Sequence, residues 1–262
     1  MKKSGTKIWF FFKFFSEESH ADQFIAGDLY LNTLAYFKQE ESEDGDGRRD
    51  STEAIAMWWQ PDDLVITFTV PGIGETTITK RDLAGPVSIG SVHHDYMHLL
   101  CLYALHTTGF ECVDRKIECS PEDAEELRRQ VKIDERCFKF GKFTVIIPAV
   151  QFLNRLREAL ISQGYGFTGK LVKYYDEDVF HGQIPTEDIP FTKQKRFSYQ
   201  REFRVCVDTG TQQEAAITIN IGDISHICAK KDATQLPGIF ELREVKPGIP
   251  LSVPANVEPG VN

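Results

Sequence analysis

The first half of the chain alternates apolar runs with short polar segments, a pattern typical of strands joined by a helix and loops. Residues 7–15 are aromatic and predict a buried strand. Residues 16–27 begin with an acidic turn, continue with spaced apolar residues and end in glycine, which predicts a short helix. Residues 28–31 follow as a strand. Residues 64–70 and 75–79 alternate apolar and polar side chains across a Pro-Gly turn, so they predict a β-hairpin.

The second half of the chain carries the two clearest helix signals. Ser120 and Pro121 are a typical cap and first residue, and that helix is expected to end near Val131. A second helix is expected from Pro148 to Gly164. Its apolar side is expected to comprise Val150, Leu153, Leu156, Leu160 and Ile161. Further strands are expected at 97–105, 143–147, 170–175, 197–207 and 215–221.

Strands outnumber helices in this order and do not alternate regularly with them, which favours an α+β fold over a doubly wound parallel sheet. The chain has 262 residues, of which 41% are hydrophobic, and it contains no internal repeat or long linker. We therefore expect a single domain over residues 1–245. Residues 246–262 are rich in proline and are expected to form a C-terminal tail.

The composition excludes several classes of protein. No apolar run approaches the ~20 residues that a membrane-spanning helix needs. The apolar run near the N-terminus is interrupted at Lys13 and no small-residue cleavage site follows, so we do not expect a secretion signal. The six cysteines form no CxxC pair, which favours reduced thiols in the cytoplasm over a zinc ribbon. The net charge of −9 opposes diffuse binding to nucleic acid but is compatible with a local basic patch.

Two motifs match known sites in their letters but not in their context. Residues 164–169 have the glycine spacing of a dinucleotide-binding loop, but a helix is expected to end there and a strand to begin, the reverse of that loop's order. Residues 93–98 contain three histidines but lack the carboxylate-bearing partner motif of common zinc sites. Histidines at the surface or the edge of the core are the preferred interpretation, and a metal-dependent hydrolase built on them is a third hypothesis.

The densest concentration of chemical groups lies in residues 191–204. Basic and aromatic residues interleave there, which suits a phosphate-bearing ligand with a stackable base. The basic residues are Lys193, Lys195, Arg196, Arg201 and Arg204, and the aromatic residues are Phe191, Phe197, Tyr199 and Phe203. If this segment is a strand from residue 197, Gln200, Glu202 and Arg204 point to one side. These side chains either line a cleft or form an ion pair on a solvated face.

Two features of this segment resemble known families. Gln200-Arg201-Glu202 on a late strand resembles the catalytic motif of the ADP-ribosyltransferases, in which Gln or Glu precedes the catalytic Glu by two residues. The run from Tyr199 to Arg204 also resembles the Tyr-x-x-Glu-x-Arg strand of a bacterial family of unassigned function.

The N-terminal part of the chain is similar to the same superfamily. The segment from Lys13 through the Gly-Asp-Leu-Tyr sequence at 27–30 to Thr33 resembles its first strand, helix and second strand. Lys13 stands where the superfamily has Arg or His, and Asn32-Thr33 stands in place of a Ser-Thr-Ser motif. The resemblance covers residues 8–53 and 170–207.

The resemblance implies a split pair of small antiparallel sheets with NAD, as co-substrate, in the cleft between them. It implies that Glu202 stabilises the positive ribosyl group that forms when nicotinamide leaves, and that Gln200 orients the acceptor. The residues that it assigns to NAD binding are Lys13 at the phosphates, Thr33 or Tyr36 at the nicotinamide ribose or ring, and Tyr199. The residues expected to contact substrate, or to form a lid beside a loop over 38–50, are Arg48, Arg49, Asp50, Glu53 and Arg196.

The implied function is NAD-dependent mono-ADP-ribosylation of a macromolecule, either RNA or protein. Such an enzyme would be a bacterial toxin or an anti-phage effector in the cytoplasm, with an antitoxin protein as a partner. The alternative is a non-catalytic module that binds nucleic acid or protein through residues 193–204. The two hypotheses differ in one respect: the enzyme requires Lys13, Thr33 and Glu202 to converge on one cleft, whereas the binding module does not.

Overall fold

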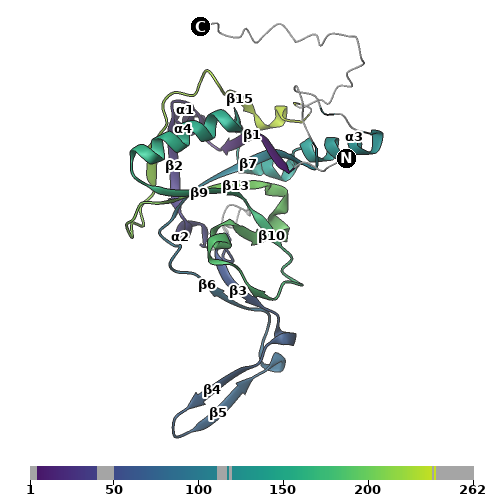
Figure 1. Cartoon of the computed structure of the whole chain (residues 1–262), viewed down its shortest axis with the longest axis vertical. Helices are drawn as coiled ribbons and strands as arrows, with labels where there is room; N and C mark the ends of the chain where they lie inside the picture. Colours follow the sequence, from purple (N-terminus) through teal and green to yellow (C-terminus); the bar gives the residue numbers. More distant parts are fainter. Residues whose placement is uncertain (1–4, 40–49, 111–116, 118–119, 238, 240–262) are drawn as a thin grey trace.

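The computed structural model describes residues 5–239 apart from 40–49, 111–116, 118–119 and 238 (Figure 1). Within this part of the chain the fold is a mixed α+β arrangement of mostly antiparallel sheets with few helices. That coarse fold class is the one expected from the sequence. None of the described helices is both long and apolar enough to cross a bilayer.

An antiparallel sheet of eight strands forms the centre of the fold. Its main path runs β14-β2-β7-β1-β8-β15, while β13 also pairs with β7 and β9 pairs with β13. The strands are β1 (Thr6–Phe15), β2 (Asp28–Thr33), β7 (His98–Thr108), β8 (Phe143–Pro148), β9 (Gly166–Leu171), β13 (Glu202–Asp208), β14 (Ile217–Asn220) and β15 (Ala229–Asp232). The strands predicted at 7–15, 28–31, 97–105 and 143–147 are confirmed.

Helices α1 (Glu18–Ile25) and α4 (Ala149–Ser162) pack on one face of this sheet. The predicted helix bounds are confirmed, but the predicted apolar side of α4 is wrong at Val150 and Ile161, which are exposed. Phe152 is fully buried instead and packs against the rings of Phe11 and Phe24. The large phenylalanine ring therefore sets which side of the helix meets the core. The buried residues of α4 are Ala149, Phe152, Leu156 and Leu160.

Strand β7 is the point where the sheet divides. Tyr103 pairs with Phe12 of β1 on one side and with Glu202 of β13 on the other. The pairing of β1 with β7 ends there, although β1 continues along β8 as far as Phe15. The same edge of β7 next pairs with β2, at Leu99 and His98. Strands β1 and β7 therefore pair as far as Phe12 and diverge beyond it, although all eight strands belong to one hydrogen-bonded sheet. We call this divergence the split.

Smaller elements cover the opposite face of the sheet, and their apolar side chains form a second core. They include a three-stranded sheet, a parallel pair of strands and a short helix. Their bounds are α2 (Leu34–Phe37), β3 (Ile55–Trp59), β6 (Val87–Gly90), β10 (Lys173–Tyr175), β11 (Gly182–Gln183) and β12 (Thr192–Gln194). Strands β4 (Ile66–Val70) and β5 (Gly74–Ile78) form the predicted hairpin, which projects away from the body (Figure 1).

The strand predicted from residue 197 is wrong in its first half. Residues Lys195–Gln200 form a turn of 3-10 helix, and Arg201 then adopts a left-handed backbone with φ of 40°. Strand β13 begins only at Glu202. The alternation argument therefore fails for Gln200, because that residue precedes the strand.

The single strand predicted at 170–175 is wrong, because β9 ends at Leu171 and β10 begins at Lys173 in a different sheet. The strand predicted at 215–221 is present as β14. Helix α3 (Pro121–Val131) begins at Ser120, whose hydroxyl accepts a hydrogen bond from the Asp123 backbone N–H. The glycine motif at 164–169 joins the end of α4 to the start of β9, so it has the helix-to-strand order that a dinucleotide-binding loop lacks. The expected tail, residues 246–262, lies outside the described residues.

Gly27 is predicted to be essential for stability. It turns the chain between α1 and β2 with φ of 103°, and a β-carbon there would lie 2.2 Å from the Gly222 carbonyl oxygen. Gly27→Ala should therefore lower the free energy of unfolding by about 2–4 kcal/mol. Gly164→Ala is the control, because φ is also positive (71°) but no heavy atom lies within 4 Å. It should cost only about 1–2 kcal/mol, and equal losses in urea unfolding would contradict this assignment.

Candidate functional site

A pocket of about 130 Å³ lies where β1 leaves β7. Its apolar walls are mainly aromatic, and they are Phe12, Phe14, Phe37, Tyr103 and Phe140 together with Leu102. Its polar lining comprises Lys13, Cys101, Lys193, Gln200, Glu202 and Arg204. Elements distant in sequence thus meet at one site, and two of them carry Lys13 and Glu202.

Lys13 enters the pocket through the split in the sheet. Its Nζ donates a hydrogen bond of 2.9 Å to the backbone carbonyl of Cys101, which lies on β7 beyond the last residue paired with β1. A paired β1 strand would occupy this position. The separation of the two strands therefore makes room for the lysine side chain.

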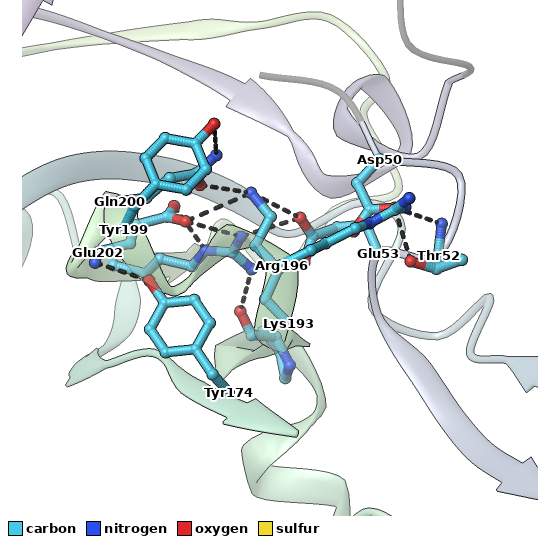
Figure 2. Close-up of polar contacts among 11 residues, drawn as sticks. Asp50, Thr52, Glu53, Tyr174, Lys193, Arg196, Tyr199, Gln200 and Glu202 are labelled. Atoms are coloured by element: carbon cyan, nitrogen blue, oxygen red, sulfur yellow. Dashed lines mark hydrogen bonds and ion pairs between the residues drawn. The ribbon is translucent and has the colours of Figure 1, made fainter. Parts of the chain in front are cut away.

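Arg204 is the centre of a buried ionic cluster. The other three members of this cluster, Glu53, Lys193 and Glu202, are labelled in Figure 2. Its Nε and Nη2 donate to the two carboxylate oxygens of Glu202 at 2.8 and 3.2 Å. Its Nη1 and Nη2 also donate to the two oxygens of Glu53 at 2.7 and 2.9 Å, and Nη1 donates to the Pro190 carbonyl at 2.7 Å. All five guanidinium N–H groups are used, so the orientation of both carboxylates is fixed.

Lys193 completes the cluster from the parallel strand β12. Its Nζ lies 3.5 Å from Glu202 and 3.6 Å from Glu53, and it donates to the amide oxygen of Gln200 at 3.0 Å. The two cations and two carboxylates are each at most 6% exposed. Because their formal charges cancel, the cluster can stay ionised inside the protein.

The ionised state of Glu202 follows from this geometry. Burial alone would raise its pKa, but the charges of Arg204 and Lys193 outweigh burial and hold the pKa well below the ordinary value. Burial, and then the charge of Glu202, raise the pKa of the neighbouring Cys101 thiol. Cys101 therefore stays protonated near neutral pH and is not a candidate nucleophile, because nucleophilic attack requires the thiolate.

The cluster predicts a specific dependence of stability on pH. The Glu202 pKa is lowered from an ordinary value of 4.5, so its stabilising effect is complete above that value and is lost as the pH falls below it toward the folded pKa. In urea unfolding from about pH 6 down to about pH 3, the difference in free energy of unfolding between wild type and Glu202→Gln should narrow. A difference that stays constant over this range would contradict the assignment.

No family model, curated protein or solved structure matches this chain.

Thr33 does not converge on the pocket, so that expectation is wrong. Its hydroxyl caps α2 by accepting a hydrogen bond from the Tyr36 backbone N–H, and its backbone pairs with His98 of β7. Glu202 pairs with Tyr103, five residues further along the same strand, a separation of about 17 Å. Tyr36 does not line the pocket either, whereas its neighbour Phe37 does.

Gln200 lines the pocket, and Tyr199 lies beside it without being part of the lining. The Gln200 amide nitrogen lies 3.4 Å from the Tyr199 hydroxyl, and its amide oxygen faces Lys193. The Tyr199 ring stacks on Phe140 with an interplanar angle of 10°, and the Arg136 guanidinium lies over it. The predicted association of Gln200 with Glu202 in one site is thus found, although the 3-10 turn and not strand alternation produces it.

Two residues of the expected lid, Asp50 and Glu53, are buried and form ion pairs with residues 196–204. Asp50 and Glu53 are both 2% exposed, so they are not part of a solvated cluster. Glu53 pairs with Arg204, and Asp50 lies 3.5 Å from the largely exposed guanidinium of Arg196. These two ion pairs tie the segment before β3 to residues 196–204. Arg48 and Arg49 lie outside the described residues.

The basic and aromatic surface expected over residues 193–204 is not formed. Lys193 and Arg204 are buried in the ionic cluster, and only Lys195 and Arg196 of the five basic residues are exposed. The rings of Phe191, Phe197 and Phe203 are buried as well. This segment therefore contributes lining residues to the pocket and does not form a broad interface for nucleic acid. The lining residues are Lys193, Gln200, Glu202 and Arg204.

The histidines at 93–98 have local partners. His94 Nδ1 lies 2.7 Å from the Ser91 hydroxyl, and His98 Nε2 lies 3.0 Å from the Ala215 carbonyl. Among the residues that the structure describes, no group of three metal-ligating side chains is present. The interpretation as histidines at the edge of the core is therefore supported for these two residues.

The pairing of Glu202 with Arg204 was one of the interpretations left open by the sequence, and that pair is present. Three other parts of the site were not predicted. Sequence reasoning did not identify Lys193 and Arg204 as interior groups, or Glu53 as their counter-charge. The spacing of Glu202 and Arg204 on one strand was the available signal; the approach of Glu53 from elsewhere in the chain had none.

Proposed function

We propose that this protein is an NAD-dependent ADP-ribosyltransferase in which Glu202 is the catalytic carboxylate. The observation that supports this proposal is the meeting of Lys13, Gln200 and Glu202 in one aromatic-walled pocket where the sheet is split. These are three of the residues that the resemblance to this superfamily assigns to the reaction. Thr33, which the resemblance also places in the cleft, lies away from the pocket and has no part in the proposed reaction. The proposal explains why an ionised carboxylate is held so firmly at the wall of a pocket.

The pocket is suited in size and lining to the nicotinamide end of NAD. Its volume of about 130 Å³ is close to the ~150 Å³ of a cavity that accommodates benzene, so one aromatic ring fits. Phe14 and Phe140 supply surfaces on which such a ring packs. In this proposal Lys13 binds the phosphates as a point charge at the split.

Glu202 acts by electrostatics. When the bond between ribose C1′ and the nicotinamide nitrogen breaks, its electron pair leaves with neutral nicotinamide and positive charge develops on the ribose. The Glu202 carboxylate stabilises that charge, as carboxylates do in glycoside cleavage. Arg204 and Lys193 act as positioning residues, since they keep the carboxylate ionised and oriented. The acceptor then bonds to C1′ and releases a proton.

The proposed acceptor is a macromolecule, RNA or protein, in a bacterial toxin or anti-phage role in the cytoplasm. The resemblance is the support for this part of the proposal, including an antitoxin protein as a partner. Gln200 lines the pocket together with Glu202, and in this proposal it orients the acceptor.

The proposal is tested with NAD labelled in its adenylate half. Purified protein is incubated with this NAD and cell extract, and RNA and protein fractions are separated and analysed by mass spectrometry. The expected product is one acceptor that carries a single ADP-ribose, absent with Glu202→Gln. Free ADP-ribose without a labelled acceptor would show that the protein hydrolyses NAD and does not transfer ADP-ribose. If no nicotinamide is released, the proposal is refuted.

The role proposed for Lys13 gives a separate prediction. Because a phosphate contact is equally strong in the ground and transition states, Lys13→Met should raise the KM for NAD about 10-fold or more with a smaller change in kcat. Lys7→Met, on the exposed part of the same strand, is the control and should leave both constants unchanged. A fall confined to kcat would contradict a binding role for Lys13.

A further inference from the structure

The projecting hairpin is an amphipathic ribbon. We call residues 66–78 the arm. The register pairs Ile66 with Ile78 and Phe68 with Thr76, so the apolar side chains of β4 and Ile78 share one face. The other face is polar: the hydroxyls of Thr67 and Thr77 lie 3.4 Å apart, and Thr69 donates to Glu75 at 3.3 Å.

The apolar face of the arm is open to solvent. Phe68 is 51% exposed, Val70 is 43% exposed and Ile73 at the tip is 86% exposed. Strands β4 and β5 pair only with each other among the described strands, and they extend away from the body (Figure 1). Such alternation is typical of a sheet with one buried face, and a lone two-stranded ribbon is only marginally stable in water. The arm therefore has the pattern of a surface that another molecule covers.

The charges of the arm restrict what that molecule is. Residues 66–78 contain one charged side chain, Glu75, and no lysine or arginine, in a chain of which 26% is charged. A phosphate backbone or an anionic lipid surface requires cations, and the net charge of −9 repels both. An uncharged apolar ribbon fits an equally uncharged apolar surface, and the arm of an identical chain offers one.

We propose that the arm is a homodimerisation surface, on which the arm of a second copy packs face to face. A two-fold axis makes the interface self-complementary, with Phe68 and Val70 of each copy facing the other and the threonine face in solvent. Because the arm projects from the body, the contact joins two acidic chains without bringing their charged surfaces together. This inference does not depend on the proposed enzymatic function.

The oligomeric state tests this inference. The interface is small, so a dissociation constant in the micromolar range is expected, measured by sedimentation equilibrium from about 1 to about 200 μM. Phe68→Ser combined with Val70→Ser should weaken dimerisation at least ~100-fold. Val179→Ser, which alters a residue 75% exposed outside the arm, is the matched control and should dimerise like wild type. Unchanged circular dichroism and melting temperature of the body will establish that the variants fold.

Cysteine cross-linking tests the face that is used. Phe68→Cys should form a covalent dimer under mild oxidation, and peptide mass spectrometry should identify the bond between the two introduced residues. Thr67→Cys, on the opposite face of the same strand, should not. A monomer over the whole concentration range, a double variant that dimerises like wild type, or binding to lipid vesicles without dimerisation would each overturn the proposal.

Discussion

Glu202→Gln is expected to reduce the rate of nicotinamide release from NAD at least ~100-fold while the protein remains folded. Glutamine keeps the size and shape of the side chain but removes the negative charge that the proposed mechanism places beside the electron-poor ribose carbon. The measurement is the single-turnover rate at saturating NAD, which reports the chemical step and not binding.

Two controls make the result of this substitution specific. Glu214→Gln changes an exposed carboxylate far from the pocket lining and should leave the rate unchanged. Circular dichroism should show that Glu202→Gln remains folded, since the substitution also leaves Arg204 with one neutral partner. A folded Glu202→Gln protein that releases nicotinamide at the wild-type rate would remove Glu202 from the chemistry.

Arg204→Met is expected to cause the largest loss of stability among single substitutions in the pocket, about 3–5 kcal/mol in free energy of unfolding. Arg204 is 1% exposed and forms ion pairs with two buried carboxylates. Its removal leaves Glu53 and Glu202 with only Lys193 between them. Urea unfolding near neutral pH measures the loss.

A matched pair of variants distinguishes lost charge balance from lost packing. Glu53→Gln in the Arg204→Met background removes one unpaired carboxylate, so the double variant should be more stable than Arg204→Met alone. Lys195→Met breaks an exposed pair with Asp176 and should have a much smaller effect. If the two substitutions in the cluster simply add, the account of a coupled ionic cluster is wrong.

The sequence predicted much of the framework because the decisive signals were local. Apolar runs, helix caps and glycine stops depend on a few neighbouring residues, and the strands at 7–15 and 97–105 and the helix from Pro148 were correct for that reason. The error on the apolar side of α4 arose from a tertiary contact. The ring of Phe152 packs against Phe11 and Phe24, which no pattern within the helix specifies.

The candidate site was only partly accessible from the sequence. The resemblance brought Lys13 and Glu202 together, but it also included Thr33, which the register of β2 on β7 places well away along β7. The burial of Arg204 depends on Glu53, which lies 151 residues away in the chain. Whether a charged strand residue is solvated or interior is decided by such partners, so residues 193–204 were misread as a surface.

In the proposed mechanism the Glu202 carboxylate lies beside the nicotinamide ribose of bound NAD. A crystal structure of the Glu202→Gln variant with NAD will show whether residue 202 has this position, since the inactive variant preserves the bound molecule. We expect the nicotinamide ring to pack against Phe14 and Phe140, with the residue 202 side chain within hydrogen-bond distance of the ribose. NAD bound elsewhere, or a pocket that stays empty of NAD at saturating concentration, would contradict the proposed mechanism.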